Sequence, residues 1–122
     1  KPILATGDKA LCLEAEALLP GIETVCVKEG LMPGSGDECT FEEYNSRNIA
    51  AIHKAPEKSR ELIEEGAYRA LARYLENRDS FSDLIVEAPY EKTVVYRPGE
   101  GKAGYTFVSG NHKTPWDAIN AR

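Results

Sequence analysis

The first 28 residues alternate between apolar, strand-like runs and one amphipathic helical segment, and this order constrains the fold more than any other feature. An apolar run over Pro2 to Thr6 ends at Gly7-Asp8, which is typical of a buried strand followed by a tight turn. From Lys9 to Leu19 apolar residues recur at helical spacing until Pro20-Gly21, and a β-branched run follows over Ile22 to Lys28. Two strands joined by one helix of this length predict a parallel βαβ unit with a right-handed crossover.

Two further helices are predicted in the middle of the chain. Thr40 to Glu43 match the S/T-x-x-E capping box and predict a short helix that continues to about His53. Pro56 suits the first position of a longer helix that runs to about Asn77 with one apolar face. Because a parallel sheet needs helices on both faces, we expect the rest of the chain to supply further helices.

The last third of the sequence is strand-like. Asp83 to Arg97 is β-like and Ala103 to Val108 returns after the turn at 98–101, so a hairpin is predicted. Thr114-Pro115 then has the order of a helix start. The predicted fold class is α/β: a βαβ unit with parallel strands, a long amphipathic helix, a β-hairpin and a short C-terminal helix. We expect residues 1–122 to form a single α/β domain.

Charge and hydropathy exclude two classes of partner. The 122 residues include 15 Lys and Arg against 20 Asp and Glu, a formal net charge of −5. This balance lacks the basic footprint of nucleic-acid binding. No apolar stretch reaches the roughly 18 residues of a membrane span, and the first residues do not form a signal peptide. We therefore expect no nucleic acid, no membrane and a cytoplasmic location.

The three cysteines and the glycine-rich loop match no known functional motif. Cys12, Cys26 and Cys39 include no C-x-x-C pair and predict neither a disulfide framework nor a zinc knuckle. Cys39 precedes a predicted helix in a loop, so a redox or acyl-transfer role for this thiol is one hypothesis. The loop over residues 29–39 fits no phosphate-binding motif.

Candidate site residues follow from position rather than from motif. In an open α/β sheet, ligands gather outside the carboxyl ends of the strands. Those ends predict a substrate cleft at Asp8 and at Lys28, Glu29 and Gly30, although Asp8 also suits an N-cap and Lys28 a solvated strand end. His53 and His112 are candidate ligands or acid–base groups, yet neither has a second ligand at metal spacing. The catalytic residues are unknown and no metal site is predicted in this chain.

Several runs resemble a known family. They are ATGDKALC at residues 5–12, LLPGIETV at 18–25, VKEG at 27–30, HKAPEKSRELI at 53–63, AYRAL at 67–71 and VEAPYEKTV at 86–94. Together they resemble the C-terminal half of the zinc-dependent D-aminopeptidases associated with dipeptide-transport operons.

This resemblance implies a metal-dependent aminopeptidase or amidohydrolase that acts on a short peptide or amide substrate, as the family does when it removes N-terminal D-residues from short peptides. Its two zinc ions are held by Asp, Glu and His of the N-terminal half, whose motifs are absent here, so no catalytic residue carries over. The chain is then the C-terminal portion or one subunit of a larger metallohydrolase, inactive alone, partnered by an N-terminal portion or companion subunit, and part of a homo-oligomer. The loop from Met32 to Asn48 is longer than the family pattern.

A different class stays open beside this one. Because no complete catalytic constellation is present, the chain could instead be a noncatalytic α/β module that binds a small ligand or assembles with a protein partner. The upstream coding sequence discriminates between the two: an Asp-x-Glu strand followed by His-containing motifs favours the enzyme.

Overall fold

The computed structural model of the chain describes residues 1–47 and 49–122. Its contacts divide the chain into two compact units, one formed by Lys1–Pro33 with Ala50–Leu84 and the other by residues 34–49 with Ile85–Arg122. Within the described residues no helix is long and apolar enough to cross a bilayer. The single α/β domain expected from the sequence stays a prediction.

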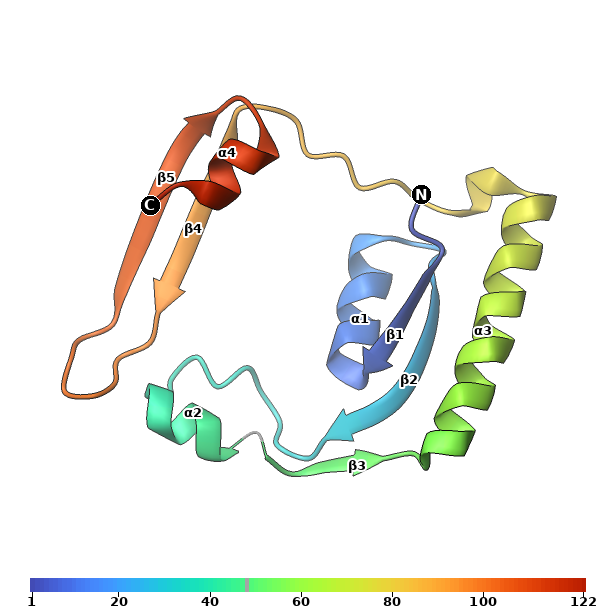
Figure 1. The fold of residues 1–122 in the computed structure, drawn as a ribbon, viewed down its shortest axis with the longest axis horizontal. Helices are drawn as coiled ribbons and strands as arrows, with labels where there is room; N and C mark the ends of the chain where they lie inside the picture. Colours follow the sequence, from blue (N-terminus) through green and yellow to red (C-terminus); the bar gives the residue numbers. More distant parts are fainter. Residues whose placement is uncertain (48) are drawn as a thin grey trace. The chain divides into compact units, whose positions relative to one another are not determined.

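The first unit begins with the predicted βαβ arrangement (Figure 1). Strand β1 (Leu4–Asp8), helix α1 (Lys9–Leu18) and strand β2 (Glu23–Gly30) follow one another, and β1 pairs parallel with β2. The carboxylate of Asp8 caps α1 by accepting a hydrogen bond of 2.8 Å from the backbone N–H of Leu11. The βαβ prediction is confirmed, with each strand ending two residues later than expected.

The helix predicted from Thr40 to about His53 is wrong in its second half. Helix α2 spans Phe41–Arg47, and Ala51–His53 form strand β3, which pairs antiparallel with the end of β2. Asn48, which that prediction included, lies outside the described residues. Backbone groups at the end of β2 favour pairing over helix here, since Leu31 donates to the carbonyl of Ala50 at 3.1 Å and Lys54 to that of Val27 at 3.0 Å.

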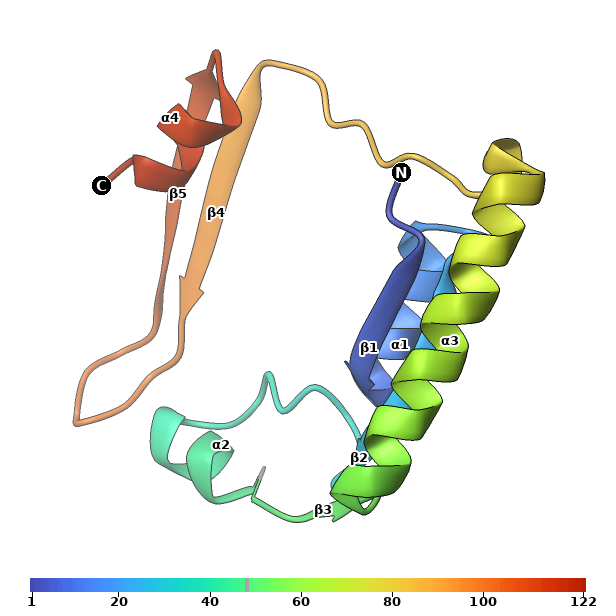
Figure 2. The same cartoon turned by 45° about the vertical axis from the view of Figure 1, so that its right-hand side comes forward.

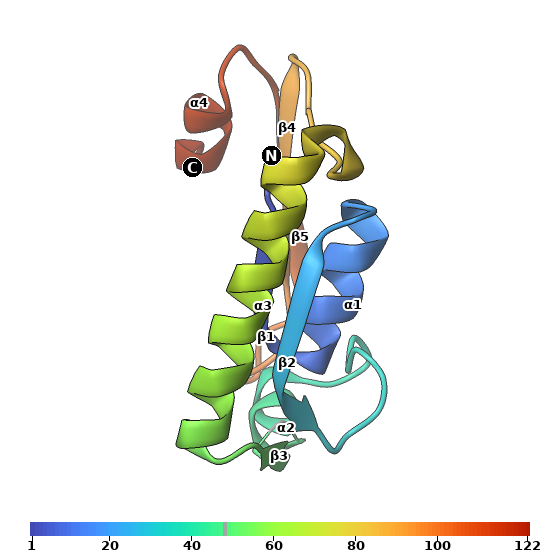
Figure 3. The same ribbon diagram turned by 90° about the vertical axis from the view of Figure 1, so that its right-hand side faces the viewer.

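The predicted long helix is confirmed as α3 (Pro56–Glu76), and it covers the second face of the sheet. Figures 1 and 3 show α1 and α3 on either side of β2, and Figure 2 shows the long helix α3 running alongside β1 and α1. Small residues at the contact let α3 approach closely: Gly66 and Ala70 are buried, and a Cβ on Gly66 would collide with a methyl group of buried Val25. Phe81, which is 1% exposed, closes this core beyond the end of α3.

A carboxylate at the start of β2 ties the sheet to α3. Glu23 is half-buried and accepts hydrogen bonds from Arg69 Nε at 2.8 Å and Arg73 Nη1 at 3.1 Å. Arg73 also donates to the carbonyl oxygen of Gly21 at 2.6 Å and lies over the ring of Phe81 at 4.7 Å from its centroid. These bonds hold the end of the sheet that begins β2.

The second unit is built on the predicted hairpin. Strands β4 (Tyr90–Tyr96) and β5 (Tyr105–His112) pair antiparallel, and α4 (Pro115–Asn120) follows the Thr114 cap. The strand expected to begin at Asp83 begins only at Tyr90, because Pro89 cannot donate to a ladder. The ammonium of Lys92 donates to the carbonyl oxygens of Ile119 and Ala121 and holds the end of α4 against the hairpin.

Candidate functional site

The first unit has a hollow where the carboxyl ends of β1 and β2 meet the start of α3. Its volume is about 520 Å³. We call it the carboxyl-end hollow, and it is lined by Gly7, Asp8, Leu11, Val27, Lys28, His53, Lys54, Pro56 and Ser59. Its position is the one that the topology of a parallel pair predicts for a ligand site.

Three of the candidate residues predicted from sequence come together in this hollow. In the sheet register Asp8 lies opposite Lys28, and Lys28 lies opposite His53. Residues directly opposite in an antiparallel pair project from the same face of a sheet, so Lys28 and His53 are neighbours there. Asp8 keeps its capping bond to Leu11 while it lines the hollow, so the N-cap and site interpretations apply to the same side chain.

The other candidates lie elsewhere. The side chain of Glu29 accepts a hydrogen bond from Lys9 at 2.7 Å, and this bond raises the pKa of the Lys9 ammonium. Gly30 ends β2 opposite Ala51 and does not line the hollow. His112 belongs to the second unit, where its Nε2 lies 2.9 Å from Ser109 Oγ. Roles for Glu29, Gly30 and His112 stay predictions.

Lys54 is a lining residue that the sequence did not single out. It follows strand β3 and precedes the Pro56 start of α3, and its backbone N–H bonds to Val27. The signal was present in part, because a lysine beside His53 and just before a helix start brings positive charge to a helix N-terminus. It was not recognised because residues up to His53 were predicted to be helical.

The described residues do not fit the zinc ions that the resemblance implies. No group of three or more His, Cys, Asp or Glu side chains among residues 1–47 and 49–122 has the arrangement to hold a metal ion. The carboxyl-end hollow itself offers one carboxylate and one imidazole, together with two lysines that would repel a cation. We therefore derive no chemical step through a metal in this chain.

The second unit has a hollow of another character, with a volume of about 580 Å³, which we call the aromatic hollow. Tyr96 and Tyr105 stack in it with ring centroids 4.4 Å apart, and the Arg97 guanidinium lies 4.1 Å from the centroid of Tyr44. Phe41 donates its backbone N–H to Pro98 at 2.8 Å, which joins α2 to the turn of the hairpin. The aromatic rings of this hollow, with the Arg97 guanidinium over Tyr44, offer faces on which planar or apolar groups can pack.

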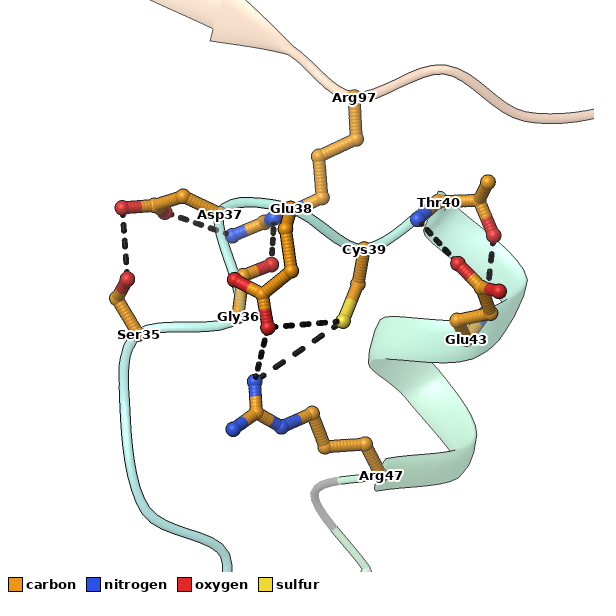
Figure 4. A network of polar contacts seen from close by, with 9 residues as sticks. All are labelled: Ser35, Gly36, Asp37, Glu38, Cys39, Thr40, Glu43, Arg47 and Arg97. Atoms are coloured by element: carbon orange, nitrogen blue, oxygen red, sulfur yellow. Dashed lines mark hydrogen bonds and ion pairs between the residues drawn. The ribbon is translucent and has the colours of Figure 1, made fainter.

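Polar contacts hold the loop before α2 (Figure 4). Arg97 donates to the carbonyl oxygen of Gly36, and its Nη2 lies 3.3 Å from Asp37 Oδ1. Cys39 Sγ lies 3.8 Å from Glu38 Oε1 and 4.0 Å from Arg47 Nη1. The Cys39 thiol therefore lies between one anionic and one cationic side chain.

Comparison with protein families places the chain among known proteins. A profile of the D-aminopeptidase family matches residues 2–107. The chain belongs to the D-aminopeptidase family. This D-aminopeptidase match spans the carboxyl-end hollow and all described residues that line the aromatic hollow. Neither a curated protein nor a solved structure gives a significant match. The resemblance inferred from the sequence is thereby confirmed at the level of a D-aminopeptidase-like hydrolase.

Proposed function

We propose that the chain forms one wall of the substrate cleft of a metal-dependent D-aminopeptidase, which removes N-terminal D-residues from short peptides. The observation that carries the proposal is the carboxyl-end hollow, which lies inside the family match and at the strand ends where α/β proteins bind ligands. Asp8, Lys28 and His53 contact the peptide in this proposal, and Glu29 and Gly30 border it at the end of β2.

The metal chemistry belongs to another segment in this proposal. Since the described residues contain no suitable cluster, the two zinc ions and their ligands are contributed by an N-terminal portion or a companion subunit. The chain alone then has no turnover, and the active particle is a cytoplasmic homo-oligomer. The contribution of the chain is to bind and orient the peptide, which accelerates a reaction by fixing the reacting groups in one geometry.

The test is purification of the native particle that contains this chain. Intact mass, zinc content and hydrolysis of a D-alanyl dipeptide are measured on the same fractions, with the L-alanyl dipeptide as the matched control. We expect a second polypeptide segment, about two zinc ions for each copy of the chain, and turnover of the D-isomer that a chelator removes. The chain of residues 1–122 alone serves as the inactive control.

Two outcomes contradict the proposal. Metal-dependent turnover by residues 1–122 alone would show that the catalytic groups lie in this chain. A metal-free particle without turnover of either isomer would favour the noncatalytic α/β module.

A further inference from the structure

Two lysines of the carboxyl-end hollow have no carboxylate partner among the described residues. The chain has 15 Lys and Arg and a net charge of −5. Ion pairs to carboxylates are formed by Lys1, Lys9, Arg47, Lys58, Arg60, Arg69, Arg73 and Arg97. Within residues 1–47 and 49–122, Lys28 and Lys54 form none, and both line the same hollow. The hollow therefore holds two lysines that form no ion pair within the described part of the chain, beside the single carboxylate of Asp8.

The pairing of β2 with β3 determines where the side chains of Lys28 and Lys54 leave the backbone. Lys28 lies opposite His53 in the antiparallel pair of β2 and β3, and Lys54 follows His53 with its N–H bonded to Val27. Lys28 and His53 thus lie on paired strands, and Lys54 follows the end of β3. An ammonium offers three donors and an imidazole offers at least one, which suits an anion with several acceptor oxygens.

The remaining lining groups restrict the kind of anion. Asp8 adds one negative charge to the hollow, and this charge opposes a dianion more than a monoanion. Leu11, Val27 and Pro56 contribute apolar wall, which suits an organic ligand with a small side chain. A carboxylate attached to an apolar group fits both features, whereas inorganic phosphate fits neither.

We infer that the carboxyl-end hollow is a carboxylate subsite, in which Lys28, Lys54 and His53 bind the free C-terminal carboxylate of a short peptide. The inference rests on the proposed function for the identity of the peptide. It adds a specificity: the cleft selects short peptides with a free C-terminus, because only these bring the carboxylate within reach of the two lysines.

The test is an NMR titration of the ¹⁵N-labelled chain of residues 1–122 with D-alanyl-glycine and with its C-terminal amide. We expect the free acid to shift the backbone amides of Gly7, Lys28 and His53 and to bind about tenfold more tightly than the amide, since each exposed ion pair contributes up to about fivefold in affinity. Binding of the acid alone should weaken as sodium chloride is raised.

Substitutions assign the effect to the two lysines. Lys28→Gln and Lys54→Gln should each weaken binding of the acid about threefold to fivefold and leave binding of the amide unchanged. Lys113→Gln in the second unit is the matched control and should change neither. Should a variant lose its folded spectrum, the comparison of acid with amide on the unaltered chain still decides.

Three results overturn the inference: equal affinity for acid and amide, absence of binding by the acid, or tighter binding of inorganic phosphate at the same amides. The native particle separates this inference from the proposed function. Turnover of acid and amide with equal kcat/KM overturns the subsite and leaves the peptidase standing. Selective binding of the acid by the chain, with no turnover by the particle, supports the subsite and overturns the peptidase.

Discussion

Replacement of Gly21 by alanine should destabilise the first unit strongly. Gly21 lies in the turn between α1 and β2 with φ +93°, a conformation that side chains with a Cβ rarely adopt. A Cβ at this position would also collide with the carbonyl oxygen of Ser80. That carbonyl cannot move freely, because the adjacent Phe81 is buried and Ser82 donates to the carbonyl of Pro20 at 2.7 Å.

The magnitude follows from these two penalties. The left-handed conformation costs about 1–2 kcal/mol and overpacking about 1–3 kcal/mol, so Gly21→Ala should lower the free energy of unfolding by about 2–5 kcal/mol. Urea unfolding followed by circular dichroism measures it, and the melting temperature should fall by roughly 8–20 °C. Gly30→Ala is the matched control, since no atom lies within 4 Å of the position that a Cβ would occupy there, and should change stability by less than about 1 kcal/mol. A Gly21→Ala protein within about 0.5 kcal/mol of the unaltered chain would refute the reasoning.

Three further substitutions or conditions test other contacts. The N–H of Glu100 donates to Glu42 and lowers the pKa of that carboxyl. The stabilisation of the folded state by the Glu42 carboxylate is therefore complete above about pH 4.3 and is lost as the pH falls through the lowered pKa. Urea unfolding between pH 2 and 6 should show this loss of stability in acid, and Glu42→Gln should reduce it. Burial raises the pKa of the Cys12 thiol, so Cys12 should react with a thiol reagent at pH 7.5 more slowly than Cys39, as peptide mass spectrometry would show. Glu23→Gln should cost about 1 kcal/mol by urea unfolding, because two guanidinium groups lose their carboxylate, and an unchanged midpoint would contradict that role.

The sequence predicted the parts of the fold that periodicity controls. The strand, helix and strand of the first 30 residues and the long α3 each carry an apolar pattern, and each was found near its predicted bounds. Strand β3 was missed because three residues are too few to carry a period. Strand β3 forms because its backbone groups pair with those at the end of β2. A pattern of residue types along one sequence does not show such pairing.

The same limit explains the outcome for the site. Asp8 and Lys28 were identified because a rule of topology applies to strand ends wherever they fall. His53 was identified only as an isolated histidine, since its approach to Lys28 depends on the antiparallel pairing of β3. Lys54 was missed for the same reason. These residues come together through the pairing of β3 with β2, which the sequence pattern alone does not predict.

If the proposed subsite binds the peptide, stability and binding depend on residues at opposite ends of β2. Gly21 and Glu23, which hold the start of the strand, contact α3 and the segment after it, whereas Lys28 lies five residues further along, about 17 Å away at 3.3 Å per residue. Lys28 and Lys54 contribute no ion pair to the fold within the described residues, so their replacement should alter ligand affinity with little effect on unfolding. Glu23→Gln should do the reverse. A chain that kept two cations unpaired only by chance would show no such separation, because their loss would then affect neither property.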